Sequence, residues 1–215
     1  MLFRSIFTEL LEKCSTFSYY DELTSAIAAT IEDEAWIKEI YLDVEKNSKT
    51  NSDLVKLASI VINKLDDNQW ASDLLNKARE NCKDLYGYCF VAGAALTLID
   101  DDGMANELYE SGKELCQTQK EYWYLLDQIK QNDPESMLLS TTLDSALEKL
   151  NSFNDLLFFA ETALSLLNDS NKAAGIYAKA EQKAQSNGLL SMLGTSLKSK
   201  MNDSKWSSNV LRKIA

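Results

Sequence analysis

The chain has 215 residues, of which 45% are hydrophobic, so it is long enough to bury a sizeable core. Its 22 Lys and Arg against 33 Asp and Glu give a net charge of −11, which argues against nucleic acid and anionic membrane surfaces as partners. No run of 18 apolar residues occurs, so we expect no transmembrane helix. Glu9 and Glu12 interrupt the apolar stretch that a signal peptide requires, and the expected compartment is by default the cytoplasm.

A periodicity of 34 residues runs through the whole chain. An acid recurs at this spacing at Asp33, Asp67, Asp101, Glu135, Asp169 and Asp203. Three residues after these acids stand Trp36, Trp70, Met104, Leu138, Lys172 and Trp206. A fixed period in this range is typical of stacked repeats, each of which packs mainly on its neighbours. The period therefore predicts one elongated repeat domain over residues 1–215 and directs the search for function to its surfaces.

Each period predicts two amphipathic helices joined by short polar links. In the second copy, one apolar stripe follows three- and four-residue steps through Leu54, Leu57, Ala58, Val61 and Leu65. Asp67 is then a good N-cap for the next helix, whose apolar stripe starts at Trp70. Short links make neighbouring helices antiparallel. We therefore predict an all-α fold of about 13 helices without strands.

In chain order, a lone helix over 2–14 precedes six helix hairpins, at about 18–48, 52–82, 86–116, 120–150, 154–184 and 187–215. The second helices of these hairpins are predicted to begin near 34, 68, 102, 135, 170 and 204. In the fourth hairpin we expect Asp133 to be the N-cap and Pro134 the first helical residue, where a missing amide costs nothing. The closing helix is either a modest cap, part of a longer array, or a surface that packs on another copy of the chain.

The four cysteines follow the same period and predict packing rather than chemistry. Cys14, Cys82 and Cys116 share one repeat position, which other copies fill with Ser48, Leu150 and Ala184. With no Cys-x-x-Cys and no histidine, we expect buried structural thiols and no metal site. A Gly-rich phosphate loop, a Gly-x-Ser-x-Gly motif and a calcium-binding loop are also missing, so we expect neither an enzyme nor a cofactor.

The repeat has the length and part of the pattern of a known family. Asp169, Ala173, Tyr177 and Ala180 match the second-helix pattern Asp-x-x-x-Ala-x-x-x-Tyr-x-x-Ala, and the stripe from Leu54 to Val61 follows the first-helix pattern in shape. The chain thus resembles the tetratricopeptide repeat family. It departs from it by lacking the Pro near the end of the second helix and by a turn that is one residue longer. The resemblance implies a right-handed α-solenoid that binds a peptide or protein segment on its concave face.

In that family, two positions of each first helix line the concave groove. Carried over, the first position is Asp21, Val55, Cys89, Trp123, Leu157 and Ser191, and the second is Ser25, Ser59, Gly93, Asp127, Glu161 and Thr195. The Lys, Arg and Asn that clamp a chaperone's C-terminal carboxylate are missing there, so we expect instead a ligand of apolar or basic character. The predicted partner-binding residues are Trp123, Asp127, Glu161, Leu157, Ser59 and Val55.

Trp123 has two interpretations, because an aromatic residue at helical spacing either contacts a partner or packs on a neighbouring helix. Tyr122, Phe158 and Phe159 are expected in the core, and the recurring Trp36, Trp70 and Trp206 are expected to be packing residues. The predicted function is a protein–protein interaction scaffold. The alternatives are a self-assembling array that grows end to end and, less favoured, an enzyme or small-ligand receptor with a site in the groove.

Overall fold

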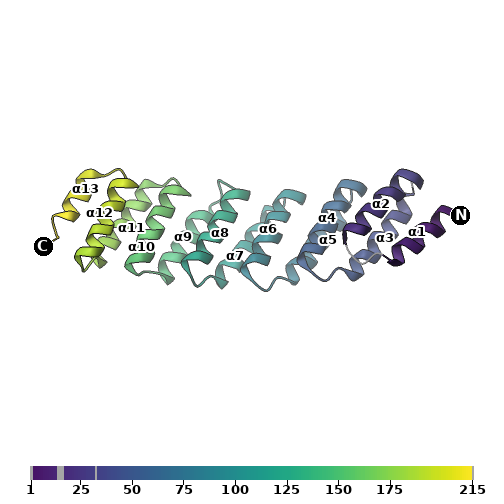
Figure 1. The fold of residues 1–215 in the computed structure, drawn as a ribbon, viewed down its shortest axis with the longest axis horizontal. Helices are drawn as coiled ribbons and strands as arrows, with labels where there is room; N and C mark the ends of the chain where they lie inside the picture. Colours follow the sequence, from purple (N-terminus) through teal and green to yellow (C-terminus); the bar gives the residue numbers. More distant parts are fainter. Residues whose placement is uncertain (1, 14–16, 32, 215) are drawn as a thin grey trace. The chain divides into compact units, whose positions relative to one another are not determined.

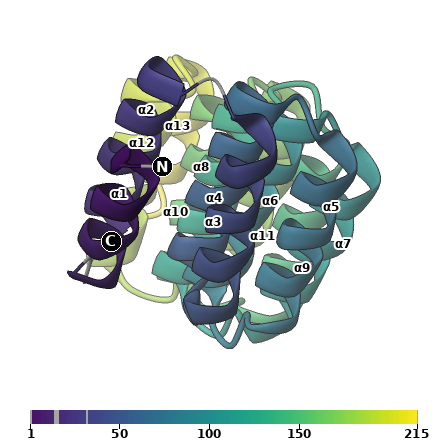
Figure 2. The same cartoon turned by 90° about the vertical axis from the view of Figure 1, so that its right-hand side faces the viewer.

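The computed structural model describes residues 2–13, 17–31 and 33–214. Every regular element in these ranges is a helix, as Figures 1 and 2 show, and the predicted all-α fold of about 13 helices is confirmed. In chain order the helices are α1 (Leu2–Lys13), α2 (Phe17–Ile31), α3 (Glu34–Asn47), α4 (Asn51–Leu65), α5 (Asn68–Glu80), α6 (Leu85–Ile99), α7 (Asp102–Leu115), α8 (Gln119–Asn132), α9 (Leu138–Lys149), α10 (Phe153–Ser165), α11 (Ser170–Lys183), α12 (Asn187–Ser199) and α13 (Ser204–Leu211).

The chain divides into two compact units. Unit 1 comprises Met1–Lys83 with Phe90–Ala105, and unit 2 comprises Asp84–Cys89 with Asn106–Ala215. Within each unit, helices that follow one another in the sequence pack together, which is the order of an α-solenoid. We call α2, α4, α6, α8, α10 and α12 helices A, and the helices that follow them helices B. In unit 2, the helix A α10 also contacts the helices A on both sides of it, α8 and α12.

Five of the six periodic acids cap a helix B. A carboxylate oxygen of each accepts the backbone N–H three residues ahead, at 2.8–3.0 Å, and the five are Asp33, Asp67, Asp101, Asp169 and Asp203. Such a cap satisfies an amide that has no partner inside the helix, and its charge is favourable at the positive end of the helix dipole. The helix starts predicted at 34, 68, 102, 170 and 204 are all confirmed.

The residue before the cap takes a left-handed conformation in four of these turns. The backbone φ angles are 50° at Asp66, 53° at Asp100, 54° at Asn168 and 57° at Asn202. Asp and Asn tolerate positive φ better than most residues do. In three of the turns, the following cap residue donates its N–H to a carbonyl six residues back in helix A, as Asp169 does to Ala163 at 3.0 Å. This bond closes helix A at the point where helix B begins.

Pro134 occupies this same repeat position in the fourth hairpin, and there our prediction was wrong. The proline ring fixes φ near about −65°, so Pro134 is unable to make the left-handed turn. Residues 134–135 form a turn outside any helix, and α9 starts only at Leu138, not near 135. Its N-cap is Met137 and not Asp133, and the Met137 side chain makes no capping hydrogen bond. Glu135, the sixth periodic acid, therefore begins no helix.

Two tryptophans hold successive helices B together through a carboxylate. The indole Nε1–H of Trp70 donates to Glu45 at 2.7 Å, and Lys77 pairs with the same carboxylate. Four repeats later, Trp206 donates to Glu181 at 2.8 Å. Lys213 pairs with Glu181 at 2.6 Å, which repeats the contact made by Lys77 in unit 1. Trp70 and Trp206 thus pack, as expected, and also anchor a charge on the preceding helix B.

Three of the cysteines, Cys82, Cys89 and Cys116, have buried side chains. Burial raises the pKa of the Cys116 thiol to about 11. Cys14 lies outside the described residues. Since the thiolate is the reactive form, the buried Cys116 thiol fits the structural role that its repeat position predicts.

Candidate functional site

The six predicted partner-binding residues lie on three helices A. Val55 and Ser59 belong to α4 in unit 1, whereas the other four belong to α8 and α10 in unit 2. Unit 2 thus carries four of the six residues on two helices that contact one another: Trp123, Asp127, Leu157 and Glu161. The candidate site is therefore the surface formed by these helices A of unit 2, and we call it the helix-A face.

Two equivalent capping boxes set the starts of α8 and α10. The Thr118 hydroxyl accepts the Glu121 N–H while the Glu121 carboxylate accepts the Thr118 N–H, and Ser152 and Asp155 repeat this exchange one repeat later. The backbone N–H of Gln117 and the Thr118 hydroxyl hold the pKa of Glu121 below its ordinary value. Each box begins its helix at the equivalent repeat position, so the predicted partner-binding residues of α8 and α10 follow their helix starts at the same spacing.

A direct hydrogen bond ties the two helices A at these starts. The side-chain amide of Gln119 on α8 donates to the Asp155 carboxylate of α10 at 2.6 Å. Deeper between the helices, the rings of Tyr122 and Phe159 meet edge to face, with centroids 6.4 Å apart. Both rings are fully buried, as the sequence predicts. The helix-A face therefore rests on a packed layer that fixes its side chains in relation to one another.

The residues carried over from the family differ in their exposure. Trp123 is 42% exposed and Leu157 is partly exposed. Val55 and Cys89, at the equivalent position of earlier repeats, are buried, with 9% and 1% of their surface accessible. Ser59 is partly exposed. Of the apolar residues at this position, only those of α8 and α10 present substantial surface to a ligand.

Sequence reasoning missed a second apolar position next to the first. Tyr124, Phe158 and Met192 follow Trp123, Leu157 and Ser191 by one residue in α8, α10 and α12, and all three have accessible surface. Met192 is 49% exposed, and Phe158, which was expected in the core, is partly exposed. The Tyr124 ring contacts the ring of Tyr86, which is itself 56% exposed, in a tilted arrangement with centroids 4.7 Å apart. The sequence signal for this position was an apolar residue that recurs every 34 positions, directly beside the stripe of buried residues.

Each apolar pair on α8 and α10 is followed by an acid one helical turn later. Asp127 accepts a hydrogen bond from the Gln131 side chain at 2.6 Å, and Glu161 accepts one from the Ser196 hydroxyl at 2.6 Å. Ser196 has only one hydroxyl proton, and its bond to Glu161 uses that proton. The Tyr177 hydroxyl, 2.8 Å from the Ser196 hydroxyl, therefore donates to Ser196. Glu161 is thus oriented by a chain of donors that reaches into the core.

Burial raises the pKa of Tyr177, the hydrogen bond with Ser196 offsets part of this shift, and the Glu161 charge adds to it. The phenol therefore stays neutral at physiological pH and keeps its role as donor. Neither Asp127 nor Glu161 forms an ion pair within the part of the chain that the structure describes. Both carboxylates are partly exposed and able to receive a cation from a partner.

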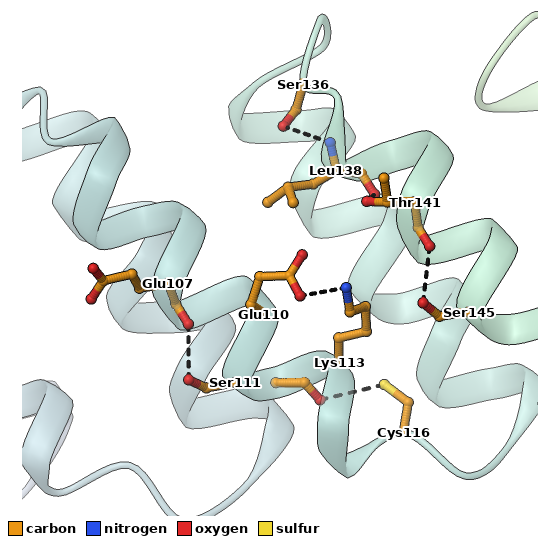
Figure 3. A network of polar contacts seen from close by, with 10 residues as sticks. Glu107, Glu110, Ser111, Lys113, Cys116, Ser136, Leu138, Thr141 and Ser145 are labelled. Carbon is orange, nitrogen blue, oxygen red and sulfur yellow. Dashed lines mark hydrogen bonds and ion pairs between the residues drawn. The ribbon is translucent and has the colours of Figure 1, made fainter.

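Polar contacts elsewhere in unit 2 do not build a second site. Figure 3 shows α7 and α9, where the Ser111 hydroxyl donates to the Glu107 carbonyl at 2.8 Å and Lys113 pairs with Glu110. Every contact drawn there joins residues at most four positions apart in the chain. These bonds satisfy the helix surfaces locally and bring no chemically reactive groups together.

Two surface hollows lie away from the predicted partner-binding residues. One, of about 440 Å³, lies in unit 1 beside Glu45 and Lys77, and the other, of about 450 Å³, lies in unit 2 at the Pro134 turn. Neither includes any of the predicted partner-binding residues. Among the described residues, no cluster of acids and cysteines has the makings of a metal site, and no helix is both long and apolar enough to cross a membrane.

No protein-family model matches this chain, and no curated protein matches it in sequence.

Proposed function

We propose that this chain is a tetratricopeptide-like scaffold, without catalytic activity of its own, that binds a peptide or protein segment along the helix-A face of unit 2. The observation that carries the proposal is the repeated apolar pair on α8 and α10, Trp123–Tyr124 and Leu157–Phe158, which stays accessible to solvent. Accessible aromatic residues on a rigid support are the usual anchors of protein interfaces.

The support beneath the face favours binding without a large ordering cost. The Gln119–Asp155 bond, the Tyr122–Phe159 ring contact and the Ser196–Glu161 bond join three successive helices A. A surface that is ordered before the ligand arrives loses less conformational entropy on binding. The same repeat arrangement extends the face along the direction in which the helices stack, which suits an elongated ligand.

The test is a selection of peptides that bind the whole chain, from a displayed random library. Binding of the selected peptides is then measured by fluorescence anisotropy for the wild type, for Trp123→Ala and for Leu115→Ala. Leu115 is a matched control because it lies on α7 and is 43% exposed, close to the 42% of Trp123. We expect Trp123→Ala to weaken binding at least tenfold and Leu115→Ala to leave it unchanged. Failure to select any peptide, or equal binding by all three proteins, would reject the helix-A face as the site.

End-to-end self-association is a second candidate, which one observation favours. Leu75 and Leu143 are fully buried, whereas Leu211, at the equivalent position of α13, is 40% exposed. An accessible apolar residue at a position built for burial is a plausible contact for another copy. Light scattering over a concentration series tests this: growth that Leu211→Glu abolishes would support self-association, and a steady monomer would reject it.

A further inference from the structure

The helix-A face of unit 2 carries the same short arrangement twice. On α8, Trp123 and Tyr124 are followed one turn later by Asp127, and on α10, Leu157 and Phe158 are followed by Glu161. The equivalent residues of α12 are Ser191, Met192 and Thr195, and those of α4 are Val55, Lys56 and Ser59. The equivalent residues of α6, Cys89, Phe90 and Gly93, include no acid, so among the described residues of helices A an accessible apolar pair with an acid beyond it occurs only on α8 and α10, which are in direct contact.

The two acids are held in place but have no cationic partner among the described residues. One oxygen of Asp127 receives the Gln131 amide, and one oxygen of Glu161 receives the Ser196 hydroxyl. A carboxylate with two oxygens keeps further acceptor capacity after one such bond. With a chain net charge of −11, the surrounding potential also favours a cationic ligand.

The spacing of the acids selects the form of that ligand. Packed helices lie about 8–10 Å apart, so equivalent side chains on α8 and α10 are separated by roughly that distance. A polyproline II segment has three residues per turn and rises about 3.1 Å per residue, so side chains three residues apart share a face and lie about 9 Å apart. A β-strand would instead turn side chains three residues apart to opposite faces.

Resting on the proposed function, we propose that the helix-A face recognises an extended, polyproline II-like segment with two arginines three residues apart and apolar residues between them. One arginine pairs with Asp127 and lies against Trp123 and Tyr124, and the other pairs with Glu161 beside Leu157 and Phe158. Arginine suits this place better than lysine, because its planar guanidinium pairs with a carboxylate through two bonds and stacks on aromatic rings.

The test uses three labelled synthetic peptides and the full chain. The first is Arg-Pro-Leu-Arg-Pro-Leu, the second has the same composition with adjacent arginines, Arg-Arg-Pro-Leu-Pro-Leu, and the third is the neutral Gln-Pro-Leu-Gln-Pro-Leu. We expect the first peptide to bind at least tenfold more tightly than the other two. Its affinity is expected to fall as salt is raised, because the two ion pairs are partly exposed.

Variants then assign the binding to the two acids. We expect Asp127→Asn and Glu161→Gln each to weaken the first peptide about tenfold, while Glu148→Gln, which removes an exposed acid of α9, leaves it unchanged. The amide variants keep the acceptors used by Gln131 and Ser196, so the fold is preserved, which circular dichroism checks. In a charge reversal, Asp127→Lys with Glu161→Lys is expected to bind Glu-Pro-Leu-Glu-Pro-Leu in place of the arginine peptide.

The peptide experiments separate failure of the paired-arginine ligand from failure of the scaffold function. Equal affinity for the first two peptides, or no effect of either acid variant, overturns the paired-arginine ligand. If library-selected peptides nevertheless depend on Trp123, the scaffold function stands and only the ligand chemistry is wrong. If they do not depend on Trp123 either, both proposals fall.

Discussion

Asp169 and Glu135 occupy the same position of successive repeats, yet only Asp169 caps a helix. The Asp169 carboxylate accepts the Lys172 N–H at 2.8 Å, whereas Glu135 lies in a turn before α9 begins. The difference follows from the residue before each acid, which is Asn168 with a φ of 54° in one turn and Pro134 in the other. A periodic acid therefore acts as a helix start only where the preceding residue is able to make the left-handed turn.

This pair provides a matched test of capping. We expect Asp169→Ala to lower the free energy of unfolding by about 1 kcal/mol, which is typical for the loss of an N-cap. Glu135→Ala is expected to change it by less than about 0.5 kcal/mol, since it is an exposed residue outside any helix. Urea denaturation followed by circular dichroism measures both. Equal losses for the two variants would contradict the assignment.

Two substitutions are expected to restore the regular turn between helices at Pro134. The double variant Pro134→Asn with Glu135→Asp recreates the Asn–Asp pair found at residues 168–169 and 202–203. We expect α9 to extend toward residue 136 and stability to rise by about 1 kcal/mol, because a left-handed turn and a cap become available. Hydrogen exchange of amides 136–138 reports the change: greater protection is expected. Unchanged exchange would show that more than this proline prevents the regular turn.

The Glu181 bridge predicts a dependence of stability on pH. Burial alone would raise the pKa of Glu181, but the hydrogen bonds from Lys213 and Trp206 outweigh it and hold the pKa below the ordinary value of 4.5. A lowered folded-state pKa stabilises the fold above pH 4.5, and the contribution disappears as the pH falls through the lowered value. We therefore expect Glu181→Gln to cost about 1 kcal/mol at pH 7.

Urea denaturation at pH 7 and at pH 3 tests this dependence. The difference between wild type and Glu181→Gln is expected to shrink at the lower pH, because the wild-type carboxylate is then increasingly protonated. Glu148→Gln serves as the control, and its effect is expected to be small at both values. A difference for Glu181→Gln that does not change with pH would show that its charge is not what stabilises the bridge.

The Cys116 thiol is predicted to resist alkylation. With a pKa raised to about 11, roughly one thiol in a thousand is ionised at pH 8, compared with about a quarter for an ordinary cysteine. Cys116 is also fully buried. Reaction with iodoacetamide, followed at Cys116 by peptide mass spectrometry, is expected to be at least a hundredfold slower in buffer than in denaturing urea. Comparable rates would indicate frequent opening of the structure around Cys116.

The helix boundaries were predictable because their signals are local. An acid such as Asp67 or Asp203 fixes the start of its helix through one hydrogen bond to a residue three positions ahead. The start of α9 was predicted wrongly because proline is also favoured at the first turn of a helix. A comparison of the repeats would have shown that Pro134 prevents the regular turn, since the equivalent Asp66, Asp100 and Asn168 all tolerate the conformation that proline forbids.

The helix-A face was only partly predictable. Transferred positions give the place of a residue along its helix, whereas the exposure of its side chain depends on its size and on the neighbours that cover it. Val55 and Cys89 are consequently buried where Trp123 is exposed. The Ser196–Glu161 bond joins residues 35 positions apart, and no spacing rule in the sequence singles out such a pair.

The irregular Pro134 turn also shows how such a chain tolerates change. Although α9 begins late, α11 begins on schedule at Ser170, because Asp169 restarts the pattern with its own cap. The longer turn in one repeat is thus compensated within that repeat and does not shift the helix starts of the repeats that follow. One repeat can therefore be gained, lost or altered by duplication or deletion in the gene, while the neighbouring repeats still fold because each carries its own capping residues.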